Sequence, residues 1–263
     1  MLMETIQYKR SSQFTQAFGN DGILYLCYLR TYLSSSKQYT LARNGNRDAL
    51  VNLAANKCPA ATRYKLRYCI DVENCKIMRD AILDDNDASA IYSYYHIVER
   101  RDEFYYKLLN MDPDQAAEWW YEYIKQYGPD TLMIDRLAKA TGRAAAIHQY
   151  MYLHSIGKDR KVIEGLAYNP DAAEYQYLYC RYIANELIMI KGLIHSQSDN
   201  RACWWYHYLK SVEFRDDVYN TLAVDYSPMG RKYLRLLQSE RNRYDSRSNK
   251  ATKSSHITEK TKR

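Results

Sequence analysis

Tyrosine side chains give this sequence its most regular chemistry. The 263 residues contain 28 Tyr and only 4 Phe, so most aromatic rings carry a hydroxyl group. Such a ring has a large apolar body and a polar tip. One column recurs at nearly constant intervals, at Tyr94, Tyr121, Tyr150, Tyr177, Tyr206 and Tyr233. A second column follows two positions later, at His96, Tyr123, Tyr152, Tyr179 and Tyr208. A row of exposed rings can stack on nucleic-acid bases or on the side chains of a peptide.

The two columns point in nearly opposite directions if they lie on helices. Residues two apart on an α-helix are separated by about 200° around its axis. One column is therefore expected to pack between helices while the other lines a groove for a partner. We assign the groove to the second column, at Tyr123, Tyr152, Tyr179 and Tyr208. The alternative is that both columns pack between repeats, since Phe is scarce and a core has to be filled.

Two tryptophan pairs add to this aromatic surface. They are Trp119-Trp120 and Trp204-Trp205, which occupy equivalent places in the pattern. Adjacent helical residues cannot both face the same core, so one member of each pair is expected at a margin. Exposed tryptophans are frequent energetic centres of protein interfaces. We expect Trp120 and Trp205 to contact a partner.

Motifs for catalysis or for cofactor binding are not found in the sequence. There is no HExxH, GxSxG, GxxxxGK or GxGxxG pattern. The six cysteines include no CxxC, so zinc spacing is missing too. Acidic clusters such as Asp84–Asp87 are explained by helix starts. We therefore expect a protein that is not an enzyme, with no catalytic residues, no cofactor and no metal.

Positive charge is concentrated near the C-terminal end. The segment 231–263 holds 11 Lys or Arg and 3 Asp or Glu, whereas the segment 1–230 holds 27 basic and 28 acidic side chains. Basic side chains can neutralise nucleic-acid phosphates. The candidates for phosphate contact are Arg241, Arg243, Arg247, Lys250 and Lys253. An ordinary solubilising end is the alternative. Residues 239–263 have almost no large apolar side chains, which predicts disorder.

Proline positions indicate how the aromatic columns are held. Four prolines recur at nearly equal intervals, at Pro59, Pro113, Pro170 and Pro228. Each follows a small or polar residue, and proline suits the first position of a helix. Further starts lie midway, at Asn86, Thr141 and Asp199. Second helices are expected at Asp71, Asp102, Asp130, Asp159, Asn185 and Asp216. The sequence thus predicts helical hairpins of about 28 residues, beginning near residues 59, 86, 113, 142, 170 and 200.

Hairpins this short cannot bury an apolar face alone, so neighbouring hairpins must stack. The expected fold is all-α: an α-α superhelical solenoid of short helical hairpins with a disordered basic C-terminal tail. The expected organisation is an N-terminal arm (1–20), irregular helical hairpins or a cap (21–58), the helical-repeat solenoid (59–238) and the basic tail (239–263). Within the cap, a helix is expected over Asp21–Leu33, followed by two shorter helices that break at Asn44-Gly45.

The cadence A-x-x-G-x-x-x-A in "ARNGNRDALVNLA" (Ala42–Ala54) is common in helical hairpins. With the capped starts and the regular period, it resembles the tetratricopeptide-like superfamily of α-α solenoids over roughly Gly19 to Gln238. The units here are shorter than a tetratricopeptide repeat, which has about 34 residues. The resemblance implies a scaffold that binds other macromolecules on a concave face.

The function expected from these patterns is a non-enzymatic scaffold or adaptor that binds a protein partner through a Tyr/Trp-rich groove. The alternative is a nucleic-acid-binding protein, nucleocapsid-like or RNA-binding, that uses the basic tail and the tyrosine-lined face. No apolar run is long enough to predict a membrane span. No secretory h-region is found near the N-terminus, so a cytoplasmic location is expected, or delivery to a host cell by a signal-less route. The oligomeric state is left open.

Overall fold

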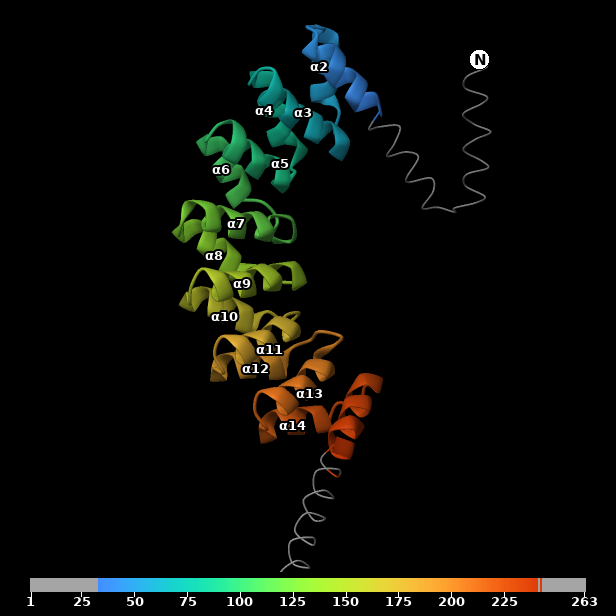
Figure 1. Cartoon of the computed structure of the whole chain (residues 1–263), viewed down its shortest axis with the longest axis vertical. Coiled ribbons are helices and arrows are strands. Elements are labelled where there is room, and N and C mark those ends of the chain that lie inside the picture. The colour runs from blue at the N-terminus through green and yellow to red at the C-terminus, as the bar shows by residue number, and fades with distance from the viewer. Residues whose placement is uncertain (1–32, 241, 243–263) are drawn as a thin grey trace, which may run out of the picture. The chain divides into compact units, whose positions relative to one another are not determined.

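The computed structural model describes residues 33–240 and 242, and no strand occurs in that part of the chain. The predicted all-α class is confirmed (Figure 1). The chain divides into two compact units, residues 1–119 and 120–263, with the division inside helix α7 (Pro113–Tyr127). The domain bounds expected at residues 20, 58 and 238 are not tested by this division. The helix expected over Asp21–Leu33 and the residues of the basic tail lie almost entirely outside the described part.

Unit 1 is built from short packed helices. They are the helix over 33–43, α2 (Arg47–Ala55), α3 (Pro59–Asp71), α4 (Lys76–Asp85), α5 (Ala88–Ser93), the π-helical turn η1 (Tyr94–Val98) and α6 (Asp102–Leu109). The predicted break at Asn44-Gly45 is confirmed: Gly45 has a φ of +87°, a conformation that favours glycine, and Asn46 caps α2. The start expected at Asp71 is wrong, because Asp71 ends α3 and α4 begins at Lys76.

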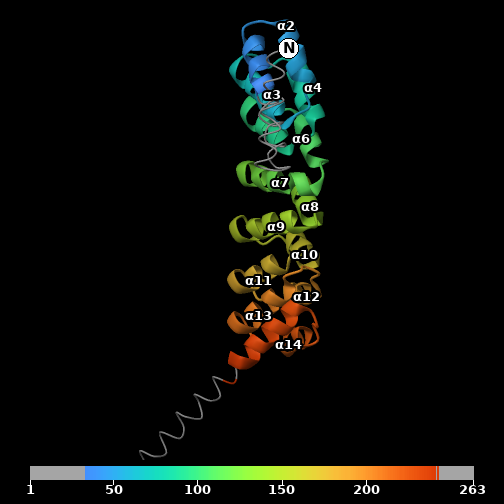
Figure 2. The same ribbon diagram turned by 90° about the vertical axis from the view of Figure 1, so that its right-hand side faces the viewer.

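Unit 2 places its helices in two rows. After the C-terminal half of α7 come α8 (Thr131–Lys139), α9 (Arg143–Ser155), α10 (Arg160–Tyr168), α11 (Ala173–Tyr182), α12 (Leu187–His195), α13 (Arg201–Ser211), α14 (Asp216–Ala223) and a last helix over 228–240. Helix α11 packs on α9 and α13, whereas α10 packs on α8 and α12. We call α7, α9, α11, α13 and the last helix the A row, and the four helices between them the B row. Figures 1 and 2 show both rows.

Acidic side-chain caps begin two of the B-row helices, α8 and α10, where the sequence places them. The carboxylate of Asp130 accepts hydrogen bonds from the backbone N–H groups of Leu132 and Met133, at 2.9 and 3.0 Å. Asp159 caps α10 in the same way. Each cap satisfies N–H groups that have no partner within the helix. The starts predicted at these two residues are confirmed, and α12 begins at Leu187, two positions after the predicted Asn185.

The Asn169-Pro170 start is wrong, because α11 begins only at Ala173. The Asn169 side chain instead binds the loop of the preceding hairpin. Its Nδ2 donates to the Gly142 carbonyl at 2.9 Å, and its Oδ1 accepts from the Gly142 N–H at 3.2 Å. Asn169 is almost completely buried, so this pairing takes the place of a cap.

Side-chain N–H donors join each hairpin to the one before it. Gln149 on α9 donates through Nε2 to the carbonyls of Leu137 and Ala140, both at 2.9 Å. Gln176 on α11 donates to the last carbonyls of α10 in the same manner. The Trp205 indole N–H donates to the Leu193 carbonyl of α12 at 2.6 Å. Carbonyl groups at the ends of B-row helices thus find partners in the next A-row helix, which satisfies buried polar groups.

Close contacts between B-row helices depend on glycine. A Cβ atom added at Gly165 of α10 would overlap the backbone carbonyl oxygen of Ala138 in α8. A Cβ atom at Gly192 of α12 would overlap the carbonyl oxygen of Ala167 in α10. The two glycines occupy equivalent positions of consecutive B-row helices, so the same close approach recurs in successive hairpins.

Candidate functional site

The four tyrosines assigned to the groove lie in the core. Tyr123, Tyr152, Tyr179 and Tyr208 are all buried. Two of their hydroxyl groups have these internal partners: Tyr179 Oη donates to Glu186 Oε1 at 2.8 Å, and Tyr208 Oη donates to Asn185 Oδ1 at 3.0 Å. Burial of a phenol is tolerated once its hydroxyl is hydrogen-bonded. This corrects the expectation that the second column lines an open groove.

The tryptophan pairs divide as expected between core and margin, but the members are exchanged. Trp120 and Trp205, the predicted contact residues, are 1% and 3% exposed. Trp119 and Trp204 are the partly exposed members. Trp119 belongs to unit 1, where its ring lies 5.2 Å from that of Tyr92. The choice of Trp120 and Trp205 is therefore corrected.

Tyrosines of the first column connect successive A-row helices. Tyr121 Oη lies 3.1 Å from Ser155 Oγ of α9, and Tyr177 Oη lies 3.0 Å from Ser211 Oγ of α13. Tyr206 Oη donates to Glu240 Oε1 of the last helix at 3.0 Å. In each case the partner stands at the same separation along the chain, on the next A-row helix. We call these three contacts the tyrosine latches.

A third aromatic column forms the exposed edge of the A row in unit 2. It consists of His148, Tyr175 and Trp204, each two positions before a first-column tyrosine and each partly exposed. Their ring centres lie 5.9, 5.9 and 5.4 Å from those of Tyr121, Tyr150 and Tyr177 on the preceding helix. The angle of about 200° explains the pattern: one ring faces the preceding helix and the other faces the following one. We call these three residues the edge column.

Cations follow the latch tyrosines by one helical turn. Lys125 Nζ lies 5.6 Å from the centre of the Tyr121 ring. Arg181 Nη1 donates to Tyr177 Oη at 2.6 Å, and Lys210 Nζ donates to Tyr206 Oη at 3.2 Å. All three cations are exposed. Residues four apart share a helix face, so this cation row runs beside the aromatic rings.

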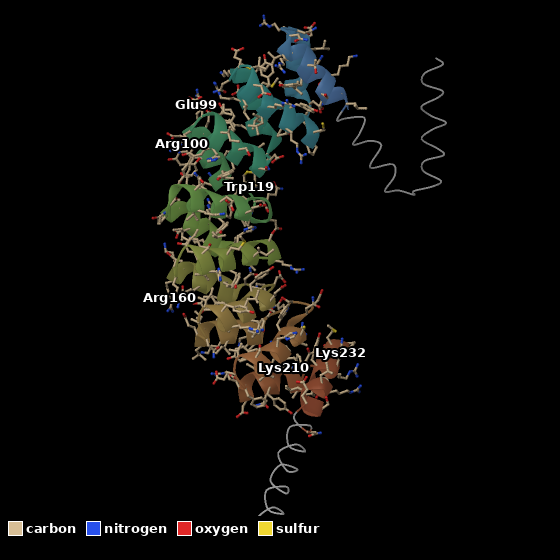
Figure 3. The ribbon with its side chains drawn as sticks, in the orientation of Figure 1. Glu99, Arg100, Trp119, Arg160, Lys210 and Lys232 are labelled. Carbon is tan, nitrogen blue, oxygen red and sulfur yellow. The ribbon has the colours of Figure 1, made fainter. Side chains whose placement is uncertain are left out.

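The edge column, the cations Arg181 and Lys210 and their exposed neighbours form one surface on α9, α11 and α13, which we call the A surface. It consists of His148, Met151, His154, Tyr175, Leu178, Arg181, Tyr182, Trp204, His207 and Lys210. Burial, followed by the nearby Lys210 and Arg181 cations, lowers the pKa of His207, so its imidazole is neutral at neutral pH. The surface offers flat apolar rings beside fixed positive charges. Figure 3 shows Arg160 at the B-row edge, away from Lys210.

Metal-ligating side chains and the Cys180 thiol bear on the chemistry of the described part of the chain. Within residues 33–240 and 242, no three His, Cys, Asp or Glu side chains are grouped so that they could hold a metal ion. Burial raises the pKa of the Cys180 thiol to about 12, so the nucleophilic thiolate is not populated at neutral pH.

Across the described residues, no helix has both the length and the apolar character needed to cross a bilayer.

The edge column could have been found from the sequence, since Tyr92, Trp119, His148, Tyr175 and Trp204 recur with the period of the tyrosine columns. The proposed phosphate contacts Arg241, Arg243, Arg247, Lys250 and Lys253 lie outside the described residues.

Comparison of the chain with protein-family models, with curated proteins and with solved structures found no match.

Proposed function

We propose that this protein is a non-enzymatic helical-repeat scaffold that binds a protein or peptide partner on the A surface. The observation that carries the proposal is the edge column. His148, Tyr175 and Trp204 remain partly exposed while each lies against a tyrosine of the preceding helix. Rings that are held in place lose little conformational freedom on binding, which favours them as interface anchors.

An α-α solenoid is the architecture that we propose for this scaffold. Its support in unit 2 is that the tyrosine latches, the side-chain donors and the glycine contacts all join a hairpin to its immediate neighbour. Repeat proteins are stabilised by such nearest-neighbour contacts. The similarity to the tetratricopeptide-like superfamily remains part of the proposal, with units of about 28 residues.

A protein partner fits the A surface better than a nucleic acid does. Its apolar members include Met151, which is 36% exposed, and Tyr182, which is 58% exposed. Acidic residues also lie beside the cation row: Glu122 pairs with Lys125 at 3.4 Å, and Glu240 pairs with Lys210 at 2.8 Å. Acids beside the cation row oppose a phosphate backbone, whereas apolar rings rimmed by mixed charges are typical of protein interfaces.

Affinity capture with the full chain tests the proposal, if it is carried out with and without nuclease. Trp204→Ala removes the largest ring of the edge column, and Arg181→Gln removes a cation while leaving that ring. Tyr168→Ala is the control, because Tyr168 ends a B-row helix and is 75% exposed. We expect nuclease-resistant partners that are lost with Trp204→Ala, weakened with Arg181→Gln and kept with Tyr168→Ala. Partners lost only with Tyr168→Ala, or released by nuclease, would overturn the proposal.

A further inference from the structure

The last helix of the A row, residues 228–240, has one face that other A-row helices bury. Its inner face lies on α13, where the ring centres of Tyr233 and Tyr206 are 5.3 Å apart. With Tyr233 aligned to Tyr206, Lys232 and Arg235 correspond to Trp205 and Tyr208, which are both buried. In the last helix these two positions are exposed and basic. Charged side chains are seldom buried. A cation at a position that is buried in another A-row helix therefore indicates a face that contacts water or a charged partner.

Arg231, Lys232 and Arg235 gather on this face with Leu236. The four residues line an open hollow of about 670 Å³, together with Pro228 and Ser239. Within the described residues, none of the three cations forms an ion pair with a carboxylate. We call Arg231, Lys232, Arg235 and Leu236 the basic face.

The acid of this helix is turned away from the basic face. Glu240 Oε1 accepts from Lys210 Nζ at 2.8 Å and from Tyr206 Oη at 3.0 Å, so both of these partners belong to α13. The helix therefore directs its carboxylate inward and its three cations outward. A helix end that needed only solubility could expose acids and bases equally.

We propose that the basic face binds the phosphate backbone of a nucleic acid, separately from the protein partner of the A surface. Arg231 and Arg235 are four positions apart, so the three charges span about 6 Å of helix axis. A single strand of duplex DNA carries one negative charge per about 3.4 Å of helix axis, a similar linear density. The sequence continues this charge, because the segment 241–263 holds 8 basic and 2 acidic side chains.

Other occupants fit the basic face less well. Helices that lie on a membrane insert a broad apolar face, whereas the large apolar side chain of the basic face is Leu236 alone, which is 40% exposed. A protein interface needs a buried apolar or aromatic centre, which the basic face lacks. Contacts made only by cations are typical of binding to a phosphate backbone.

The test is the salt dependence of binding by the full chain to a fluorescein-labelled duplex DNA of mixed sequence. The test variant is Arg231→Gln/Lys232→Gln/Arg235→Gln. The control variant is Lys139→Gln/Lys158→Gln/Lys191→Gln, which removes three exposed cations elsewhere in unit 2. A third variant, Arg231→Lys/Arg235→Lys, keeps the charge. Circular dichroism verifies that each variant keeps its helices, and phosphatidylserine vesicles and poly-glutamate serve as competing probes.

We expect the wild-type chain and the charge-keeping variant to bind DNA with the same salt slope. The test variant should weaken binding and lower the magnitude of the log–log slope by about 2.7, since each phosphate contact contributes about 0.9. The control variant should change the slope by less than about 0.9, the contribution of one phosphate contact. No binding by the wild-type chain, equal losses in the test and control variants, or tighter binding to vesicles or poly-glutamate would overturn the proposal.

Discussion

Tyr177 and Ser211 join neighbouring helices of the A row, with Tyr177 Oη 3.0 Å from Ser211 Oγ. The same contact recurs between Tyr121 and Ser155 at 3.1 Å. Tyrosine packs through its ring against one helix and reaches the next helix with its hydroxyl. Phenylalanine would supply only the first of these, which gives a physical reason for tyrosine at positions 121 and 177.

The hydroxyl contact should contribute measurably to stability. Tyr177→Phe and Ser211→Ala are each expected to lower the free energy of unfolding by about 0.5 to 1.5 kcal/mol, the usual net value of one hydrogen bond. Tyr177 Oη also accepts from Arg181 Nη1 at 2.6 Å, and Ser211 also donates to the His207 carbonyl at 2.7 Å, so a double-mutant cycle is needed to isolate the pair. Urea unfolding measures all four proteins.

The control for this cycle is Tyr150→Phe. The residue that stands in the latch position relative to Tyr150 is Ala184, which has no side-chain hydroxyl. The change should alter the free energy of unfolding by less than about 0.5 kcal/mol. A coupling energy near zero for Tyr177 and Ser211 would contradict the stabilising role of the latch.

Glycine at the crossing of α10 and α8 should be essential for close packing. Gly165→Ala places a Cβ atom in the Ala138 carbonyl, so the helices must separate, with an expected loss of about 1 to 3 kcal/mol. Gly157→Ala is the matched control, since a Cβ atom there meets nothing within 4 Å. Thermal unfolding of both variants measures the difference, and equal transition temperatures would contradict the packing argument.

The starts of α8 and α10 could be predicted from the sequence because their signals are local. Asp130 and Asp159 are helix caps wherever they precede an apolar run, so their regular spacing was enough to place α8 and α10. Asn169 failed as a cap because its amide is used by Gly142 of the preceding hairpin. That contact connects two residues a full hairpin apart and leaves no local signal.

The side of each A-row helix that neighbouring helices cover was the second feature that could not be predicted from the sequence. Spacing shows that Tyr121 and Tyr123 face opposite sides, but not which side is covered. In the structure both are buried, since hairpins pack on the helix from two directions. For the same reason Trp205 was expected at the margin, whereas Trp204 is the partly exposed member of that pair. In the structure the Trp205 indole N–H donates to the Leu193 carbonyl, a contact that the spacing of residues does not indicate.

A buried ion pair in unit 1 provides another prediction. Lys65 Nζ lies 2.8 and 2.7 Å from the two carboxylate oxygens of Asp85, and both side chains are at most 1% exposed. Lys65→Met leaves the Asp85 carboxylate buried without this partner, which should lower the free energy of unfolding by about 3 to 5 kcal/mol. The double variant Lys65→Met/Asp85→Leu should lose less than the single one. A larger loss in the double variant, measured by urea unfolding, would contradict this.

Alkaline pH should destabilise the fold through its buried tyrosines. Burial raises the pKa of Tyr208 to about 12, although its hydrogen bond to Asn185 acts in the opposite direction. An unfolded tyrosine loses its proton near pH 10. Between about pH 10 and 12 the unfolded chain therefore binds fewer protons, and stability falls as pH rises, by up to about 1.4 kcal/mol per pH unit for this residue.

Tyr208→Phe should reduce that slope in a series of urea unfolding curves from pH 8 to 11. Tyr226→Phe is the control, since Tyr226 is 80% exposed and its change should leave the slope as it is. An unchanged slope in Tyr208→Phe would show that the Tyr208 hydroxyl does not cause the loss of stability at alkaline pH.

Site-specific photo-crosslinking tests the A surface as a partner-binding surface most directly. A photo-reactive phenylalanine analogue replaces Met151 on α9 in one protein and Leu187 on α12 in another; both side chains are exposed, one in each row. The scaffold account predicts a nuclease-resistant protein adduct from position 151 that disappears with Trp204→Ala, and none from position 187. An adduct only from position 187, or no protein adduct from position 151, would contradict it.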